Sequence, residues 1–392
     1  NLPDRFELMD GRTLAGVLLR RDDQGFHIAQ KSRVRVIPVK NIRKVEGPRV
    51  AYPDYITRLR LTFRKKPVKP EATLQLASWC REHGLLRDER IHLLRSLLLD
   101  PGNRAAHEAL GHRFLGGRWR VPTAQGGLVP WAEMLQRRRS FASPWKVTTS
   151  HFSVQAAGDL GEVLDLASSL EILYEAFFEM FQSKTGFYEV REPISILVYP
   201  GEKDFPRQSG TFQVYFDPGT REVRSYFQDG RAVSIEHEVT HALLHVTVRE
   251  FERDEPMVPG WLNEGLANYM AVAMAGNPEA PHFEPGRRSP VYFQVQASHP
   301  HPDSLIRVLT YKSGEFTSTT NSDLKYAQSY TLVYYLLHSG DSGLREGFFR
   351  FLRSVYSRQG SMSHFKKALG TRNLDLLETR WAAYVRKIAN RD

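Results

Sequence analysis

Cysteine is almost absent from this chain, since Cys80 is the only one among 392 residues. A single cysteine excludes an intrachain disulfide and a cysteine-ligated structural zinc. The apolar stretch Leu76–Cys80 around it predicts a helix core and an inert, packed thiol. Without disulfides the redox compartment stays open, because such a chain can fold in the cytoplasm or outside it.

Long hydrophobic runs are also missing. No apolar stretch approaches the roughly 18 residues that span a bilayer, so the chain is not expected to be transmembrane. The sequence begins Asn1-Leu-Pro without a methionine, and we expect that an upstream segment, such as a signal peptide, was removed. An extracytoplasmic location is favoured on this ground, although the compartment is otherwise undecided.

Acidic residues are too few to balance the basic ones in the N-terminal part. Residues 1–140 hold 28 lysines and arginines against 14 aspartates and glutamates, whereas residues 141–392 hold 26 against 30. The basic surplus fits either an anionic surface or protein partner, or simply a solvated basic surface. Nucleic acid is not expected as the partner, because no known nucleic-acid motif accompanies the charge.

The length and the 41% hydrophobic content predict a multidomain α+β protein with two or three cores. Residues 5–45 alternate around the tight turns Asp10-Gly11 and Asp23–Gly25, which predicts that residues 1–62 form a small SH3-like β-barrel. A lysine- and proline-rich linker follows. Residues 70–118, with helical periodicity over Leu74–Leu99 and Arg104–Phe114, resemble one and a half tetratricopeptide-type (TPR-like) units. This segment could brace its neighbour or bind a peptide.

Residues 119–145 are rich in glycine, proline and arginine and are predicted to be a connector. Residues 146–392 form the predicted third domain, a mixed sheet with a helix laid across it. Alternation and apolar runs predict a helix over Leu160–Phe181 and strands over the ranges Thr148–Val154, Ile194–Tyr199, Thr211–Phe216 and Val223–Phe227. After Pro259 the remainder is predicted to be nearly all helical.

One motif stands out, His237-Glu238-x-x-His241. Four residues advance a helix by slightly more than one turn, so both imidazoles can point at one metal ion. Glu238 beside them could take a proton from a metal-activated water and later return it. With 14 histidines and 44 acidic residues in the chain, only about 0.06 such matches are expected by chance.

Catalytic zinc usually has three protein ligands, so a third must be found. The metzincin pattern fails, because Leu244 and Thr247 stand where that class has glycine and histidine. His245 continues the same helical stripe, but three ligands on one straight helix converge poorly, and we expect it to pack or to support the site. Glu264 is the better candidate, since the intervening chain is long enough to return and a core-facing acid needs a partner.

HExxH followed by Trp261-Leu-Asn-Glu-Gly265 resembles the gluzincin metallopeptidases, and residues 146–390 resemble the bacterial peptidase-MA-like branch of that clan. The resemblance implies a thermolysin-like domain, Zn²⁺ held by His237, His241 and Glu264, and peptide-bond hydrolysis with Glu238 as general base and then acid. It also places Asn268 where a partner of the first histidine often stands, although an exposed asparagine would look the same.

The same family uses a tyrosine or histidine from a later helix to stabilise the oxyanion. By this resemblance Tyr326 is the first choice and Tyr330 the second, although packing tyrosines would look alike. The chain departs from the aminopeptidases in two ways: the gap from His241 to Glu264 is longer and carries the charged loop Arg249–Glu255, and the Gly-x-Met-Glu-Asn element for a free amine is missing. The missing element disfavours exopeptidase action and favours endopeptidase cleavage or a narrow, unknown substrate.

The resulting hypothesis is a zinc-dependent hydrolase, most simply a metallopeptidase acting on a peptide or protein. The competing class is an inactive peptidase-fold scaffold that binds a partner through its basic N-terminal modules. A non-peptide hydrolase on the same zinc site is the third possibility, because fold and ligands do not dictate the substrate.

Overall fold

The structure is a computed structural model that describes residues 2–31, 33–64, 67–123, 126–206, 214–249, 258–275, 281–316 and 320–391. Helices and strands both contribute, so the chain is α+β, as predicted. Contacts divide it into two compact units: residues 1–175, 189–235 and 276–282, and residues 176–188, 236–275 and 283–392. This division falls inside the predicted domain 146–392 and places its sheet with the first unit.

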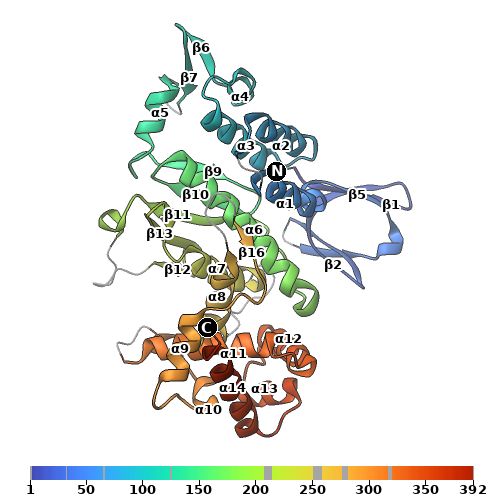
Figure 1. Ribbon diagram of the computed structural model, residues 1–392. Helices are drawn as coiled ribbons and strands as arrows, with labels where there is room; N and C mark the ends of the chain where they lie inside the picture. Colours follow the sequence, from blue (N-terminus) through green and yellow to red (C-terminus); the bar gives the residue numbers. More distant parts are fainter. Residues whose placement is uncertain are drawn as a thin grey trace. The chain divides into compact units, whose positions relative to one another are not determined.

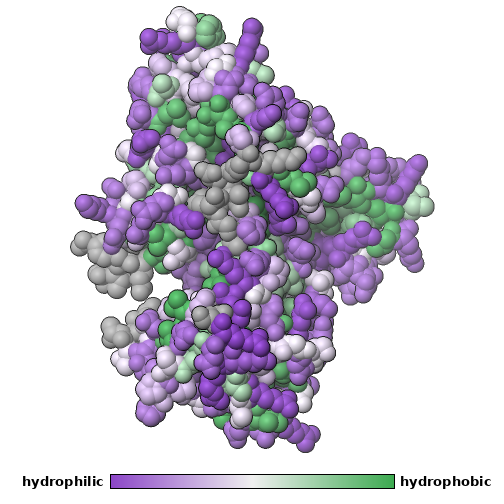
Figure 2. Space-filling view, viewed as in Figure 1, coloured by the Kyte–Doolittle hydropathy of each residue, from purple (hydrophilic) through white to green (hydrophobic). Residues whose placement is uncertain are grey.

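The first unit begins with a five-stranded antiparallel sheet in the order β4-β3-β2-β1-β5 (Figure 1). Its core consists of Phe6, Leu8, Phe26, Ile28 and Ile37, and Figure 2 shows hydrophobic residues gathered over this sheet with hydrophilic ones around them. The predicted turns are confirmed, since they join β1 to β2 and β2 to β3. The strands are β1 Asp4–Leu8, β2 Thr13–Asp22, β3 Gly25–Gln30, β4 Arg33–Ile37 and β5 Ile42–Glu46.

Helices follow the sheet: α1 (Pro48–Arg64), α2 (Pro70–Glu82), α3 (Leu86–Leu99) and α4 (Arg104–Ala109). No helix was predicted where α1 lies, and this helix carries Pro48 and Pro53. Its buried stripe has helical spacing nonetheless: Tyr52, Tyr55, Ile56, Leu59 and Phe63. The prediction of a helix over residues 104–114 was wrong beyond Ala109, because Gly111 has φ +74° and Phe114 already lies in a strand.

The predicted connector contains regular structure, which is a second correction. A three-stranded antiparallel sheet is formed by β6 (Arg113–Leu115), β7 (Arg118–Pro122) and β8 (Leu128–Pro130), and α5 (Trp131–Arg137) comes next. The glycines that suggested a loop form the tight turn between β6 and β7, where Gly116 and Gly117 both have positive φ. Trp131 and Met134 are buried and anchor α5.

The second large sheet of this unit is mixed, as predicted. Its order is β12-β13-β11-β10-β9, with β14 paired to β13, and β10, β11 and β13 run parallel. The single strand predicted over residues 148–154 is two antiparallel strands joined at residues 149–151, and residues 211–213 of another predicted strand lie outside the described residues. The strands are β9 Trp145–Thr148, β10 Phe152–Ala156, β11 Ile194–Tyr199, β12 Tyr215–Asp217, β13 Glu222–Gln228 and β14 Arg231–Ala232.

A buried acidic pair lies within the first unit. Asp88 of α3 is 0% exposed and accepts hydrogen bonds from the Ser150 backbone N–H (3.2 Å) and from its hydroxyl (2.6 Å). Glu171 of α6 (Leu160–Thr185) accepts from the backbone N–H of His151, from its ring and from the Tyr52 hydroxyl. Burial, followed by the charge of Glu171, raises the pKa of Asp88 to about 7.

Replacing Asp88 by asparagine is therefore expected to flatten the pH dependence of stability. Because the folded pKa lies above the unfolded value, the folded state holds the proton more tightly, and the wild type loses stability as pH rises from about 4 to 7. Between pH 5 and 8 the melting temperature of the wild type should fall relative to Asp88→Asn, by the equivalent of about 2–3 kcal/mol. Asp54→Asn, at an exposed site on α1, is the control. Parallel profiles for Asp88→Asn and wild type would contradict the assignment.

The second unit is almost entirely helical, as predicted for the chain after Pro259. α11 is its most buried long helix and contacts α8, α9, α12 and α14. Among the described residues no helix is both long and apolar enough to cross a membrane. The helices are the end of α6, α7 Ile235–Arg249, α8 Gly260–Ala273, α9 Pro290–Ser298, α10 Leu305–Val308, α11 Ser322–His338, α12 Ser342–Tyr356, α13 Met362–Leu369 and α14 Leu374–Ala389, and the short strands β15 Met274–Ala275 and β16 His282–Phe283 precede α9.

Candidate functional site

α7 holds the two motif histidines side by side, in the second unit. The rings of His237 and His241 are 4.6 Å apart at 85°, and their Nε2 atoms are 3.0 Å apart. Another face of the helix is apolar and buried, through Val239, Ala242, Leu243 and Val246. This amphipathic pattern fixes the rotation of α7, so both imidazoles point the same way.

α8 brings Glu264 to the same point. Its Oε2 lies 3.2 Å from Nε2 of His237 and 3.5 Å from Nε2 of His241. The helix can take this position because residue 265 is glycine: a Cβ there would be 2.6 Å from the Ser329 carbonyl oxygen of α11. Glu264 therefore reaches the two histidines, as predicted, and its position depends on the close packing of α8 against α11.

The three ligand atoms have the spacing that a tetrahedral metal requires. Metal–ligand bonds of about 2.1 Å place neighbouring ligand atoms about 3.4 Å apart, and here the separations are 3.0, 3.2 and 3.5 Å. Oε2 of Glu264 is buried, and none of its contacts has the geometry of a hydrogen bond. Among the described residues, these three form the group of close histidine, cysteine and acidic side chains able to hold a metal. The donor set and its spacing fit a bound cation.

The electrostatics of the cluster favour an ionised Glu264. Burial opposes its charge, but the imidazoles of His237 and His241 outweigh burial and lower its pKa to about 2. Burial likewise opposes a charged His241, and Glu264, Glu238 and Asn263 together raise its pKa. The cluster thus presents a carboxylate beside two ring nitrogens, as a metal site needs.

Asn268 contacts the far side of His237. The Asn268 side chain is 5% exposed, and its Oδ1 lies 3.0 Å from Nδ1 of His237. With an amide oxygen there, Nδ1 carries the proton and leaves the lone pair of Nε2 directed at the cluster. The resemblance had placed Asn268 in this position, and the exposed alternative is wrong because the side chain is buried.

Tyr292 on α9 also belongs to this group, and sequence reasoning missed it. Its hydroxyl donates to Oδ1 of Asn268 at 2.9 Å. No motif marks Tyr292 in the sequence, since 16 residues separate the end of α8 from the start of α9 and only packing brings the tyrosine near. Asn263 belongs to the motif Trp261-Leu-Asn-Glu-Gly265, but no role was predicted for it. Its side chain forms a hydrogen bond that helps to raise the pKa of His241.

The two tyrosines proposed on α11 differ in their environments. The ring of Tyr326 is 6.5 Å from that of His237 and half-buried. Burial, then the charges of Glu264 and Glu238, raise its pKa well above the usual value, so its hydroxyl keeps its proton. The Tyr330 hydroxyl instead accepts from the Ser289 N–H (3.1 Å) and donates to the Arg287 carbonyl (3.3 Å). Because its hydroxyl is already bonded to backbone groups, Tyr330 is disfavoured as the residue that stabilises the oxyanion.

On α7, Glu238 directly follows His237, and His245 lies four residues after His241. Glu238 is half-buried, and its charge acts on both His241 and Tyr326. His245 is half-buried and is not one of the three close ligand groups found among the described residues. The charged loop that follows, Arg249–Glu255, falls mostly outside the described residues.

Residues 231–360 match a family model described as a protein of unknown function (DUF1570). The matched range covers a third of the chain and includes the ligand cluster, Glu238, Asn268, Tyr292 and Tyr326. No curated protein matches the chain. The match thus includes the residues of the site in one matched range and assigns no activity to them.

Proposed function

We propose that this protein is a zinc-dependent hydrolase, and that its reaction is the cleavage of peptide bonds. The observation that carries the proposal is the convergence of His237, His241 and Glu264 at separations of 3.0–3.5 Å. Two imidazoles and one carboxylate are the ligand set of many catalytic zinc sites, which leave a fourth position for water or substrate. The gluzincin resemblance supports the same ligand set.

The residues around the cluster have separate roles in the proposal. Zinc, when bound, supplies Lewis acidity, which polarises a carbonyl and makes water ionise near neutral pH. Glu238 accepts the proton of the attacking water and returns it to the leaving amine. Tyr326 donates a hydrogen bond to the carbonyl oxygen as it gains charge, and its raised pKa keeps that proton available. Asn268 holds His237 in the required tautomer.

The domain assignments belong to the same proposal: a gluzincin-like catalytic region carried with SH3-like and TPR-like N-terminal modules. The alternative is an inactive scaffold of the same fold. What counts against the scaffold is that all three ligands and Glu238 are present together, although loss of any one of them would suffice for inactivity. A non-peptide hydrolase would use the same groups on another substrate.

Metal analysis of the purified chain, combined with turnover of a peptide library, tests the proposal. We expect one zinc per chain, peptide cleavage, loss of cleavage with a chelator and recovery when zinc is returned. A chain that folds without zinc and cleaves nothing would support the scaffold. Stoichiometric zinc without peptide cleavage, but with turnover of ester or amide substrates, would transfer the proposal to a non-peptide hydrolase.

Tyr292→Phe is expected to weaken zinc binding about 10-fold, since groups that orient a metal ligand typically contribute that much. The change removes the hydroxyl that holds Asn268 and leaves the ring in place. Competition with a chromogenic chelator measures the affinity. Tyr384→Phe is the control, because it removes a comparable hydroxyl bond to the His338 carbonyl. Equal affinity in Tyr292→Phe and wild type would show that Asn268 is held without the tyrosine.

A further inference from the structure

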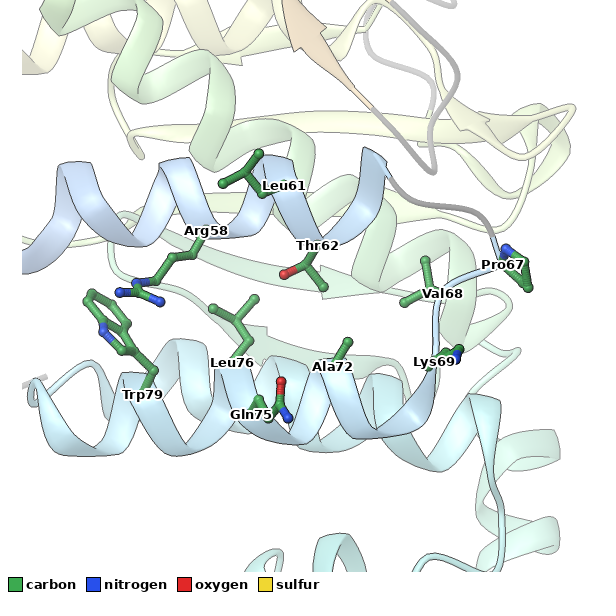
Figure 3. Close-up of a pocket in the computed structure, with 10 residues that line it drawn as sticks. All are labelled: Arg58, Leu61, Thr62, Pro67, Val68, Lys69, Ala72, Gln75, Leu76 and Trp79. Carbon is green, nitrogen blue, oxygen red and sulfur yellow. The ribbon is translucent and has the colours of Figure 1, made fainter.

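A groove lies between α1 and α2 in the first unit, and the hydrolase proposal gives it no role. Its volume is about 390 Å³, within the range of ligand-binding clefts. Figure 3 shows α1 and α2 as its two walls, with Pro67, Val68 and Lys69 at one end. It is lined by Arg58, Leu61, Thr62, Pro67, Val68, Lys69, Ala72, Gln75, Leu76 and Trp79.

The middle of the groove is apolar. Leu76 forms a buried floor, and Leu61 of α1, which also lines the groove, is 54% exposed. The lining residues of α2 recur with helical spacing over seven positions, from Ala72 to Trp79, which is about 10 Å or two helical turns. An apolar strip of this length fits two or three aliphatic side chains of a partner.

The two ends of the groove are basic. At one end the Arg58 guanidinium lies 4.9 Å from the centroid of the Trp79 ring, whose other contact is the stacked ring of His83 at 4.0 Å. Lys69 lies at the opposite end (Figure 3). No acidic residue is found among the described residues that line the groove. In the sequence, residues 58–69 include six lysines and arginines and no acidic residue.

We propose that this groove binds an acidic amphipathic peptide segment of a protein partner. Its aliphatic side chains would lie on Leu61 and Leu76, and carboxylates at its ends would pair with Arg58 and Lys69. Charge complementarity carries this choice: the described residues of the groove place a cation at each end and an apolar floor between, and none of them is acidic. The inference is independent of the zinc site, which belongs to the second unit.

Other anionic partners fit this surface less well. A nucleic acid needs cations spaced along its phosphates, whereas here an apolar strip separates Arg58 from Lys69 and would stay uncovered. A membrane surface is broad, and a narrow cleft with Leu76 at its floor offers it little contact. A peptide can cover the apolar strip and pair with both cations at the same time.

Fluorescence anisotropy of a labelled probe peptide with the full chain tests the inference. The probe is a helical peptide with leucines spaced i, i+3, i+4 and i+7 and glutamates elsewhere; its matched control has lysines in place of glutamates. We expect saturable binding of the acidic probe alone. Arg58→Glu with Lys69→Glu should weaken binding about 10-fold or more, because two attractive pairs become repulsive.

Two matched controls separate the groove from general charge and folding effects. Lys40→Glu with Arg113→Glu makes the same charge change at exposed sites outside the groove and should leave binding within about 2-fold. Leu61→Ser should weaken binding about 5-fold, whereas Val50→Ser, at another exposed apolar position of α1, should not. Circular dichroism confirms folding of each variant.

Three results would overturn the inference. The first is equal binding of the acidic and basic probes. The second is equal binding by wild type and the Arg58→Glu/Lys69→Glu variant. The third is no binding of the acidic probe, together with binding of anionic vesicles or single-stranded DNA that those two substitutions abolish, which would assign the basic segment to a different class of partner.

Discussion

Glu238→Gln is expected to lower peptide turnover about 1,000-fold while zinc stays bound. Glutamine keeps the size of the side chain but cannot accept the proton of the attacking water, and such proton transfer typically contributes 10²–10⁴-fold. Glu238 is not among the three ligand groups, so the metal content should stay at one per chain. The measurement is kcat/KM on the best library peptide, with zinc determined on the same sample.

Glu346→Gln is the matched control, because it removes a carboxylate at an exposed site of the same unit. Its turnover should equal that of the wild type. If Glu238→Gln and wild type hydrolyse the peptide equally, Glu238 is not the proton acceptor and the mechanism proposed for this site fails. Residual activity that resists a chelator would instead indicate a contaminating enzyme, and Glu238→Gln purified in parallel would show the same background.

Glu264→Ala is expected to lower zinc affinity about 100- to 1,000-fold and to abolish turnover at ordinary zinc concentrations. Structural zinc sites with four protein ligands bind with about 10–16 kcal/mol in total, so one ligand contributes roughly 2.5–4 kcal/mol, or about 100- to 1,000-fold in affinity. The increase in melting temperature on adding zinc, expected for the wild type, should disappear in the variant. Affinity is measured by chelator competition.

Glu346→Ala controls for the loss of a carboxylate elsewhere in the unit. A Glu264→Ala chain that binds zinc as tightly as the wild type would exclude Glu264 as a ligand. The variant also separates two explanations of inactivity. Glu238→Gln should retain zinc without activity, whereas Glu264→Ala should lose both, and a scaffold without a catalytic role would show no turnover in any of the three chains.

The side chains of the site come from four different helices of the second unit. His237 and His241 share one helix, Glu264 comes from a second, and Tyr292 and Tyr326 come from two more. Gly265 lets α8 approach the Ser329 carbonyl of α11, where a Cβ would lie only 2.6 Å from the oxygen. The cluster therefore depends on helix packing in the second unit as much as on the ligands, so core substitutions on α11 should affect metal binding as well as stability.

Several local features could be predicted because they depend on short-range spacing. The four-residue interval between His237 and His241 places them on one helix face whatever surrounds it. Tight glycine turns defined the first hairpins, and apolar runs defined β11 and α6. The same reasoning missed α1, where Pro48 and Pro53 obscured a buried stripe of helical spacing, and it took the Gly116-Gly117 turn of a small sheet for a connector.

The sequence by itself determined that two histidines and a glutamate of metal-ligand type exist, and that the histidines lie on one helix. Only the tertiary structure decided that Glu264 meets them at 3.2 and 3.5 Å, that Tyr330 is engaged with backbone while Tyr326 faces His237, and that Tyr292 reaches Asn268. The reason is physical: helical periodicity sets the direction of side chains within one element, whereas distances between elements depend on how whole surfaces pack.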